Sequence, residues 1–419
     1  MKAAAWFPWA SVIVLWVLSA GGASASLTDV GVYPPLVYSG FLAEAGHSYR
    51  DAIFETRIKR LSDAVGSPDV GTAGLPFVMT EYSTMTPFNQ GNSRLILQHG
   101  SYFGLYDGAG TLIRLLPAEI SAMSEPRWSR QDPAVLYFLS GNRLMRHDVN
   151  SAATSVVHTF AGYAAISGKG ESDICFDGDH FVFVGDNREI FVYEISSGSK
   201  GGVLSTGGRG IDSVHITPDD NVTVTWLQAG TARYNGIELF NRNMQFLRQL
   251  TRAGGHMDVS RDSNGDEVLL WANAADPVPV CNNGVVKVRL SDASQTCLIS
   301  LDWSLALNVS AADDSGWAYV ATYAPGDPSP ESSAWQAYTN EILQVALDGS
   351  VVRRLAHHRS RPFNDYNYTP RLSVSRDGTR LVFSSNFGMQ ENGFPTEYTD
   401  AYLIEGLSPR RDGFRVFRA

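Results

Sequence analysis

Cysteine is scarce in this chain. Only three of its 419 residues are cysteine: Cys175, Cys281 and Cys297. An odd number of cysteines cannot form a complete disulfide framework, so at least one thiol stays free or has another role. Cys281 can pair with Cys297, or it can serve as a metal ligand, and the sequence leaves both alternatives open.

The chain also lacks an excess of positive charge. It has 33 lysine and arginine residues against 43 aspartate and glutamate residues, which gives a formal net charge of −10. Binding of nucleic acid requires a basic surface that neutralises phosphates. The charge balance therefore argues against a nucleic-acid partner, and an anionic ligand would have to be bound by a few local arginines.

Long hydrophobic runs are confined to the N-terminus. Lys2 precedes an apolar stretch at residues 6–18, and Ala23-Ser24-Ala25 is a small-residue cleavage site. This pattern predicts a secretory signal peptide over residues 1–25; an uncleaved anchor is the alternative, but the apolar stretch is short for one. No later segment has the roughly 20 apolar residues of a membrane span. We therefore expect residues 26–419 to form one exported domain, secreted or periplasmic.

Several enzyme motifs are missing. The sequence contains no G-x-S-x-G elbow, no H-E-x-x-H motif and no Walker or dinucleotide-binding glycine pattern in its required context. Their absence argues against serine hydrolases and nucleotide-binding enzymes. Helical periodicity is also rare, and residues 52–61 are the best candidate for a short helix.

What the chain does contain is a repeat. A turn rich in aspartate, glycine or small residues, a strand of β-branched or aromatic residues, a polar loop and a second strand recur seven times. Equivalent turn positions lie near Asn92, Asp132, Gly178, Asp219, Gly265, Asp314 and Gly378. A period of roughly 40 to 50 residues is typical of propeller blades. The sequence thus predicts an all-β fold, a seven-bladed β-propeller of four-stranded antiparallel blades.

The fifth repeat shows the predicted strands most clearly. They span residues 257–261, 267–272, 284–290 and 296–301, and the first two are joined by the turn Asp262-Ser-Asn-Gly-Asp266. We further expect residues 27–32 and 413–417, near the two ends of the mature chain, to complete one blade together.

Strand direction assigns each connection to one face of the ring. In an antiparallel blade, the connection that leads into the first strand and the connection between the second and third strands lie on the same face. We call it the entry face, and the opposite one the exit face. The longer and chemically richer connections belong to the entry face, so we expect function there, near the central axis.

One group of entry-face residues suggests a metal site. His256 opens the fifth blade, Cys281 lies in a loop of that blade, and His357 and His358 lie on the way into the seventh. Imidazole and thiolate are the ligands that a zinc-like ion prefers. The alternatives are a Cys281–Cys297 disulfide and an exposed basic loop around the two adjacent histidines.

A second group has the chemistry of an active site. His99, Tyr82, Arg127 and Arg209 all fall on the entry face. Arginine on a glycine-flanked loop suits a carboxylate, because its fork donates two hydrogen bonds, and histidine or tyrosine can move a proton. The alternatives are a salt bridge between Arg127 and Glu125, a hydrogen-bonded loop position for His99, and ordinary packing for Tyr82.

The layout resembles the seven-bladed propeller polysaccharide lyases, including oligogalacturonate and ulvan lyases, and more distantly the TolB-type propellers. The residues that carry the resemblance are Gly255-His256-Met257-Asp258, Cys281, His357-His358 and the segment from Tyr368 to Asn386. The fold resemblance spans the mature chain, whereas the motif resemblance is limited to these patches.

This resemblance implies a secreted lyase that cleaves a uronate-containing polysaccharide or oligosaccharide by β-elimination. It also implies a divalent metal, zinc, manganese or calcium, for which His256, Cys281 and His357 match the ligand positions. Arg209 would act on the uronate carboxylate, and His99 and Tyr82 are candidate acid and base groups. We expect the partner to be an anionic saccharide and the protein to be a monomer.

Two other functions remain open. One is a non-catalytic, TolB-like propeller that binds a protein or glycan. The other is a glycoside hydrolase, which needs two facing carboxylates; the candidates are Glu125, Glu171, Asp173, Asp212 and Asp258. In a lyase or a glycoside hydrolase, aromatic side chains on the entry face would stack against sugar rings: Trp226, Tyr234, Tyr323, Trp335, Tyr338, Phe387 and Tyr398.

Overall fold

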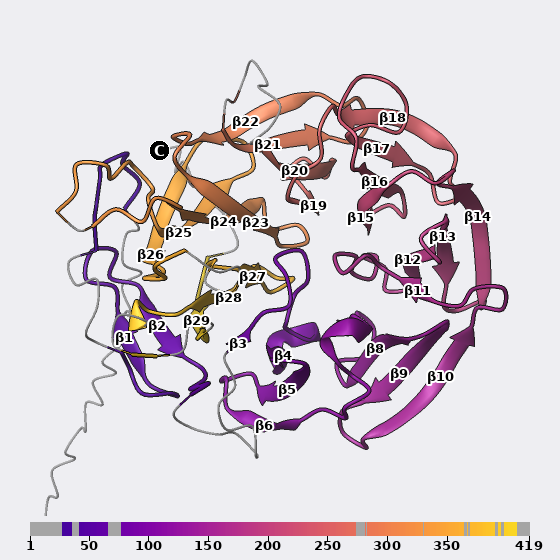
Figure 1. Cartoon of the computed structure of the whole chain (residues 1–419), viewed down its shortest axis with the longest axis horizontal. Coiled ribbons are helices and arrows are strands. Elements are labelled where there is room, and N and C mark those ends of the chain that lie inside the picture. The colour runs from indigo at the N-terminus through magenta and orange to yellow at the C-terminus, as the bar shows by residue number, and fades with distance from the viewer. Residues whose placement is uncertain are drawn as a thin grey trace, which may run out of the picture.

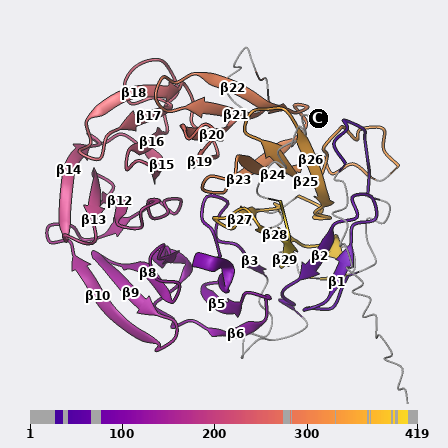
Figure 2. The same ribbon diagram turned by 180° about the vertical axis from the view of Figure 1, so that it is seen from behind.

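The computed structural model shows a ring of seven antiparallel sheets around a central axis (Figures 1 and 2). It describes residues 27–35, 42–65, 77–273, 281, 283–329, 331–363, 367, 369–389, 393–394 and 398–408. The predicted signal peptide, residues 1–25, lies outside the described residues. Within the described ranges, no helix has the length and apolar character needed to cross a membrane.

Six blades have four strands each. The strands of each blade are given from the axis outwards: blade 1 contains β3 (Val78–Met79), β4 (Arg94–His99), β5 (Tyr102–Asp107) and β6 (Leu112–Leu115), and blade 2 contains β7 (Arg127–Trp128), β8 (Val135–Ser140), β9 (Arg143–Asp148) and β10 (Ala153–Thr159). Blade 3 contains β11 (Ile166–Ser167), β12 (His180–Gly185), β13 (Glu189–Glu194) and β14 (Ser199–Ser205), and blade 4 contains β15 (Ile211–Ile216), β16 (Val222–Trp226), β17 (Ile237–Phe240) and β18 (Phe246–Thr251). Blade 5 contains β19 (Met257–Arg261), β20 (Glu267–Asn273), β21 (Gly284–Arg289) and β22 (Gln295–Ser300), and blade 6 contains β23 (Ala306–Ala311), β24 (Trp317–Tyr323), β25 (Glu341–Ala346) and β26 (Val352–His357).

Blade 7 closes the ring with strands from both ends of the chain. Its order is β27 (Leu372–Val374), β28 (Arg380–Ser385), β29 (Asp400–Glu405), β2 (Arg57–Arg60) and β1 (Ser48–Arg50). Two three-residue 3-10 helices, η2 (Gln90–Asn92) and η3 (Ala122–Ser124), complete the described elements. The prediction of a seven-bladed propeller of four-stranded antiparallel blades is confirmed, with an additional fifth strand in blade 7.

Blade 5 shows why these segments form strands. Its four strands lie within one residue of the predicted bounds at each end. In β20, successive residues from Val268 to Trp271 are all fully buried, because neighbouring blades cover both faces of the strand. The turn that follows β19 closes with the Gly265 amide donating to the Asp262 carbonyl, and Gly265 has a φ of 83° that favours glycine.

The strand that closes the ring differs from the predicted one. Residues 52–61 do not form a helix but contain β2, because Ile58 pairs with Ile404 and becomes fully buried against blade 7. The Arg60 guanidinium donates to the Asp400 carboxylate at 2.7 Å and reinforces this pairing. Leu27 makes only an isolated bridge with Arg354 on β26, and residues 413–417 lie outside the described part of the chain.

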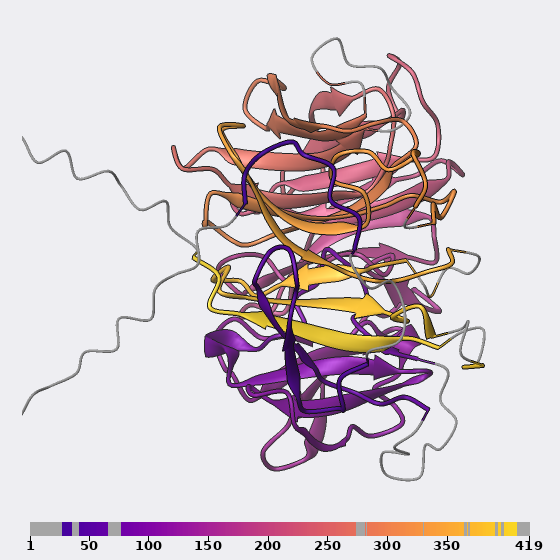
Figure 3. The same ribbon diagram turned by 90° about the vertical axis from the view of Figure 1, so that its left-hand side faces the viewer.

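Hydrophobic side chains fill the spaces between neighbouring blades. Figure 3 shows the blades from the side. One such cluster joins β20 and β21 of blade 5 with β23 to β25 of blade 6. Another joins blade 6 to blade 7 and includes Ile58 of the closing strand. The core is therefore a ring of interfaces between blades, and the axis itself is left to polar side chains.

The inner strands of blades 1 and 3 are interrupted. After Met79 the chain leaves the sheet and returns only at Phe88, which bridges Leu95. Blade 3 behaves alike: β11 ends at Ser167, and the chain rejoins β12 where the Cys175 amide donates to the His180 carbonyl. The two inserted segments, residues 80–86 and 168–172, meet near the axis, where the Thr84 hydroxyl donates to the Glu171 carbonyl. They bring side chains to the axis that a regular inner strand would not carry there.

Candidate active site

Tyrosine, histidine and carboxylate side chains gather on the entry face close to the axis. We call Tyr82, Glu171, Asp212, His215 and His256 the axial cluster. Tyr82 and Glu171 come from the two inserted segments, His256 directly precedes β19, and the other two belong to β15. The two predicted residues Tyr82 and His256 are thus brought together, although one was expected to move a proton and the other to bind a metal.

The Tyr82 hydroxyl lies 2.5 Å from His256 Nδ1, and this is the shortest contact of the axial cluster. The ring centroids are 6.0 Å apart and the rings are tilted by 34°. Tyr82 is half-buried and His256 is exposed, so both can meet a ligand that arrives from solvent. A phenol hydrogen-bonded to an imidazole can transfer its proton to that imidazole, which is what a general base and its proton acceptor must do.

Carboxylates surround this pair. Glu171 Oε2 lies 3.6 Å from Nε2 of the buried His215, and this imidazole nitrogen has no hydrogen-bond partner among the described residues. Burial raises the pKa of Asp212, and the nearby charge of Glu171 raises it further, whereas His256 and Lys169 act in the opposite direction. The axial cluster therefore holds groups of both signs that can take up or release protons.

Glu81 and Arg127 form an ion pair beneath the axial cluster. Arg127 Nη1 donates to Glu81 Oε2 at 2.9 Å, and the Arg127 guanidinium also donates to the backbone carbonyls of Ser172 and Gly170. Burial raises the pKa of Glu81 to about 7, against the opposing effect of Arg127. Arg127 is itself buried, so it holds the inserted segments in place and does not face a ligand. Its expected partner Glu125 lies farther away, at 4.0 Å.

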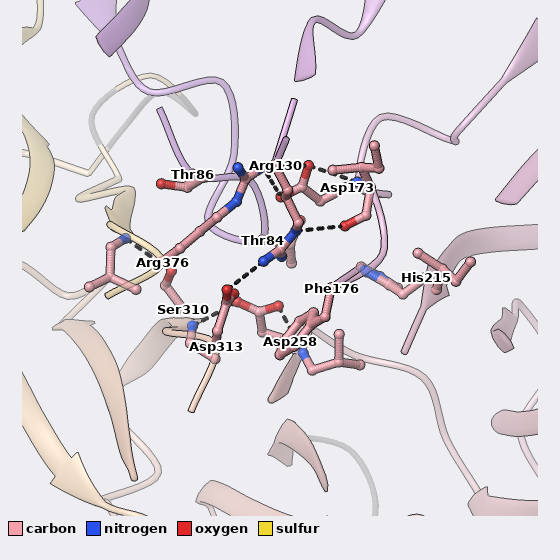
Figure 4. A pocket seen from close by; sticks show the side chains of 15 residues that line it. Thr84, Thr86, Arg130, Asp173, Phe176, His215, Asp258, Ser310, Asp313 and Arg376 are labelled. Carbon is pink, nitrogen blue, oxygen red and sulfur yellow. Dashed lines mark hydrogen bonds and ion pairs between the residues drawn. The ribbon is translucent and has the colours of Figure 1, made fainter. Parts of the chain in front are cut away.

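Below the axial cluster the central channel is crossed by ion pairs, which Figure 4 shows converging from several blades. Arg130 pairs with Asp313, and Arg376 Nη2 lies 3.2 Å from Asp173 Oδ2. Asp258 faces the same small cavity of about 30 Å³, and burial raises its pKa well above the usual range although two backbone amides donate to it. These pairs occupy the channel interior, so a large ligand would meet the axial cluster at the channel mouth.

The predicted metal set is corrected by the structure. Cys281 forms a disulfide with Cys297, so its sulfur is not available as a thiolate ligand. His357 is buried, with Nδ1 bonded to Asp51 at 3.1 Å and Nε2 to the Tyr33 carbonyl at 2.6 Å.

His358 is also fully buried. Its Nε2 donates to the Thr322 carbonyl at 3.0 Å, and its Nδ1 accepts the Ser360 amide. Both nitrogens of each of the two adjacent histidines are therefore already bonded, and only His256 of the predicted set lies near the axis.

His99 and Arg209 contact residues outside the axial cluster. His99 is the last residue of β4 and is buried inside blade 1, where its Nε2 contacts the Tyr106 hydroxyl at 2.6 Å. Burial lowers the pKa of His99 to about 4, so this imidazole is neutral at pH 7. Arg209 is exposed on the entry face, 4.1 Å above the Tyr234 ring, and donates to the Thr206 carbonyl. Its role in binding a carboxylate stays a prediction.

Most of the aromatic side chains proposed for sugar stacking are buried. Tyr234 and Tyr323 keep partial exposure, whereas the others pack among the loops: Trp226, Trp335, Tyr338, Phe387 and Tyr398. Sequence reasoning also missed Glu81 and Lys169, which belong to the two inserted segments. The available signal was the length of the connections after β3 and β11, which exceeds that of the tight aspartate and glycine turns in other blades.

The ligand atoms of the axial cluster are not closely grouped. Among the described residues, groups of at least three histidine, cysteine or carboxylate ligand atoms within 4.8 Å of one another occur only around His180. These groups lie on the exit face. The axial cluster contains histidine and carboxylate side chains, which are residue types that bind divalent cations, but their ligand atoms are not gathered within that distance in this structure.

No known family model matches this chain, and no curated protein matches it by sequence. Solved structures do match its fold. An oligogalacturonate lyase in complex with manganese has a TM-score of 0.59 and 14% identity, with 86% of this chain and 96% of that chain covered. An oligogalacturonate lyase from Vibrio parahaemolyticus has a TM-score of 0.58 and 10% identity, with the same coverage. At such identities, the likeness establishes the shared seven-bladed propeller fold.

Proposed function

We propose that this protein is an exported lyase that cleaves a uronate-containing polysaccharide or oligosaccharide by β-elimination at the axial cluster. The observation that carries the proposal is the 2.5 Å contact between the Tyr82 hydroxyl and His256 Nδ1, at the axial mouth of a propeller that is similar to oligogalacturonate lyases. The pair provides a proton acceptor where a saccharide can reach it.

The reaction needs a base, a proton donor and a positive charge near the uronate carboxylate. The base removes the proton from the carbon next to the carboxylate, the electron pair of that C–H bond becomes a C=C bond, and the C–O bond to the leaving sugar breaks. Tyr82, after passing its proton to His256, is the proposed base. The leaving oxygen then takes up a proton, and the same pair can return it.

Two cations on the entry face are suited to the uronate carboxylate. Lys169 is half-buried and lies close enough to Asp212 for its charge to oppose the rise of the Asp212 pKa. Arg209 is exposed on the same face, between blades 3 and 4. Neutralising the carboxylate makes the neighbouring C–H proton more acidic, which is the main requirement of β-elimination. A few local cations also reconcile an anionic substrate with the net charge of −10.

Export is supported by the Cys281–Cys297 disulfide, because such bonds persist in oxidising compartments outside the cytosol. It agrees with the signal peptide proposed for residues 1–25. We propose that the mature protein acts as a monomer in the periplasm or outside the cell, where polymeric saccharides are found.

The proposal is tested by incubating the purified full-length mature protein with a panel of uronate polysaccharides and oligosaccharides. Ultraviolet absorbance of the unsaturated product should rise with at least one substrate. His256→Ala should lower that rate at least about a hundredfold, since it removes a proton acceptor. His47→Ala is a matched control, because His47 is an exposed histidine on the ring-closing segment. Absence of unsaturated product across the panel would contradict the proposal and favour the non-catalytic binding function.

Glycoside hydrolysis is a second candidate. The raised pKa values of Glu81 and Asp212 favour it, because one carboxyl group must stay protonated to act as the acid. The same panel separates the two reactions: a hydrolase releases reducing ends with no increase in ultraviolet absorbance, whereas a lyase produces both.

A further inference from the structure

A thiol, an imidazole and two carboxylates converge on the exit face, at the boundary between blades 3 and 4. Cys175, Asp177 and His180 lie in and just after the connection between β11 and β12, and Asp220 lies in the turn between β15 and β16. Figure 1 shows β12 and β15 in neighbouring blades. This group takes no part in the proposed lyase chemistry, which is located on the opposite face.

Three of the side chains surround one nitrogen of the fourth. His180 Nδ1 lies 3.8 Å from Cys175 Sγ, 3.3 Å from Asp177 Oδ2 and 3.5 Å from Asp220 Oδ1. One ligand atom from each of the four residues falls within 4.8 Å of all the others. Tetrahedral zinc with bonds of roughly 2.0 to 2.3 Å separates its ligand atoms by about 3.3 to 3.8 Å. The three distances from His180 Nδ1 therefore fall in the range of a tetrahedral site.

The Cys175 thiol sits where a cation would be favourable. Cys175 is fully buried, and its Sγ accepts the His180 backbone amide at 3.0 Å. The Cys175 thiol donates to Asp177 Oδ1 at 2.5 Å. A metal ion replaces the thiol proton, because a coordinating thiol is deprotonated on binding.

Asp220 provides a second, independent sign of a missing partner. Its Oδ1 is buried and makes no hydrogen bond among the described residues, and it lies 3.5 Å from His180 Nδ1. A buried carboxylate oxygen that makes no hydrogen bond is costly, and a coordinated cation would compensate it.

The outer side of His180 has the surroundings of a metal-bound histidine. Its Nε2 lies 3.9 Å from Glu194 Oε1, on the neighbouring strand β13. Histidine ligands usually present their second nitrogen to a carboxylate, which fixes the orientation of the ring. Asp177 is exposed, so the site is open to solvent on one side and an ion can enter there.

Blade 7 contains the same turn without the metal-binding residues. Ser375, Asp377 and Arg380 occupy the places of Cys175, Asp177 and His180. In both turns the glycine amide donates to the carbonyl three residues earlier, and the first side chain donates to the aspartate, with Ser375 Oγ at 2.7 Å from Asp377 Oδ1. Serine therefore satisfies the turn, and the turn itself does not require the cysteine or the histidine of blade 3.

We propose that Cys175, Asp177, His180 and Asp220 bind one zinc ion that links blades 3 and 4 on the exit face. Zinc is favoured over manganese and calcium because thiolate and imidazole are softer ligands than the oxygen donors which those ions prefer. The ion links two blades that also share a hydrophobic cluster, so its role is structural.

The test uses the full-length mature protein, stripped with a chelator and dialysed against zinc. Elemental analysis should find one zinc per chain, and cobalt in place of zinc should give a near-ultraviolet thiolate-to-cobalt charge-transfer band. Cys175→Ser keeps the turn, as blade 7 demonstrates, but should weaken zinc binding at least about tenfold and abolish the band. His180→Asn should also weaken binding.

Two matched variants make the outcome specific. Ser375→Cys places a thiol in the equivalent turn beside Arg380, and it should add no second zinc. His256→Ala, at the axial cluster, should keep its zinc, so loss of lyase activity and loss of zinc are separate results. A stripped and reloaded wild-type protein with no bound zinc and no cobalt band would overturn the proposal. So would a Cys175→Ser variant that binds zinc as the wild type does.

Discussion

Two histidine pairs on the entry face invite comparison. At the axis, His256 Nδ1 meets the Tyr82 hydroxyl; at the rim, His357 Nδ1 meets the Asp51 carboxylate. The rim histidine is buried with both ring nitrogens and its backbone amide bonded, whereas the axial histidine is exposed. The sequence places both on the same face. What separates the buried histidine from the exposed one is its position relative to the axis.

The strand order explains the difference. His357 ends β26, the outermost strand of blade 6, where the N-terminal segment around Tyr33 and Asp51 covers it. His256 precedes β19, the innermost strand of blade 5, and it is exposed among the described residues. Burial by a second segment satisfies the polar atoms of the rim pair, so that pair contributes to stability, while the axial pair remains accessible for chemistry.

The largest expected effect is at the axis. Tyr82→Phe removes the hydroxyl that contacts His256 and should lower kcat on a responsive uronate substrate at least about a hundredfold. The free energy of unfolding should change by less than about 0.5 kcal/mol, because Tyr82 is only half-buried.

Tyr102→Phe is the matched control for this variant. Tyr102 is exposed at the start of β5, on the same face but away from the axis. The comparison between axis and rim fails if steady-state kinetics show the same activity for both tyrosine variants.

The opposite result is expected at the rim. Asp51→Asn should lower the free energy of unfolding by about 2 to 3 kcal/mol, the value of hydrogen bonds to a charged group. The kcat of the folded protein should not change. Urea unfolding at pH 7 measures the first quantity; an unaltered unfolding midpoint would show that the rim pair does not stabilise the fold.

The rim pair should also make the free energy of unfolding depend on pH in the acid range. Burial alone would raise the pKa of Asp51, but its bonds to His357 and to the Phe54 amide outweigh this effect and lower it to about 2. An unfolded aspartate has a pKa of about 3.9, so the stabilisation is complete above about pH 4 and is lost as the pH falls towards 2. Asp51→Asn should flatten this part of the stability profile.

The smallest effect is expected inside blade 1. His99→Gln should cost about 1 kcal/mol, since it weakens one buried hydrogen bond to Tyr106, and it should leave kcat unchanged. Thermal unfolding together with the lyase assay checks both quantities. A large loss of kcat in a stably folded His99→Gln protein would place His99 in the active site, as the sequence had suggested.

The fold was largely predictable because a repeat constrains it seven times. The turn residues and strand pattern of blade 5 located its strands, and strand direction alone placed Arg209, His256, Cys281 and His357 on one face. The helix expected at residues 52–61 was wrong, because pairing of Ile58 with Ile404 depends on a contact that local periodicity does not contain.

The site was only partly predictable for a related reason. Tyr82 and His256 were both recognised, but their contact depends on the insertion of residues 80–86 towards the axis. Such an insertion breaks the repeat, so the repeat cannot place its residues. The pairing of Cys281 with Cys297 was one of two open alternatives, and only the three-dimensional distance between the two cysteines distinguishes them.

Ring closure by β2 and β29 sets a condition on how the protein folds. Arg60 and Asp400 are separated by 340 residues, so blade 7 cannot assemble until nearly the whole chain has been synthesised. Contacts of such sequence separation form slowly, since a long loop must be closed before they are made. The early segment must therefore wait unpaired, with its hydrophobic Ile58 exposed, and a nascent chain released before residue 400 would remain an open ring.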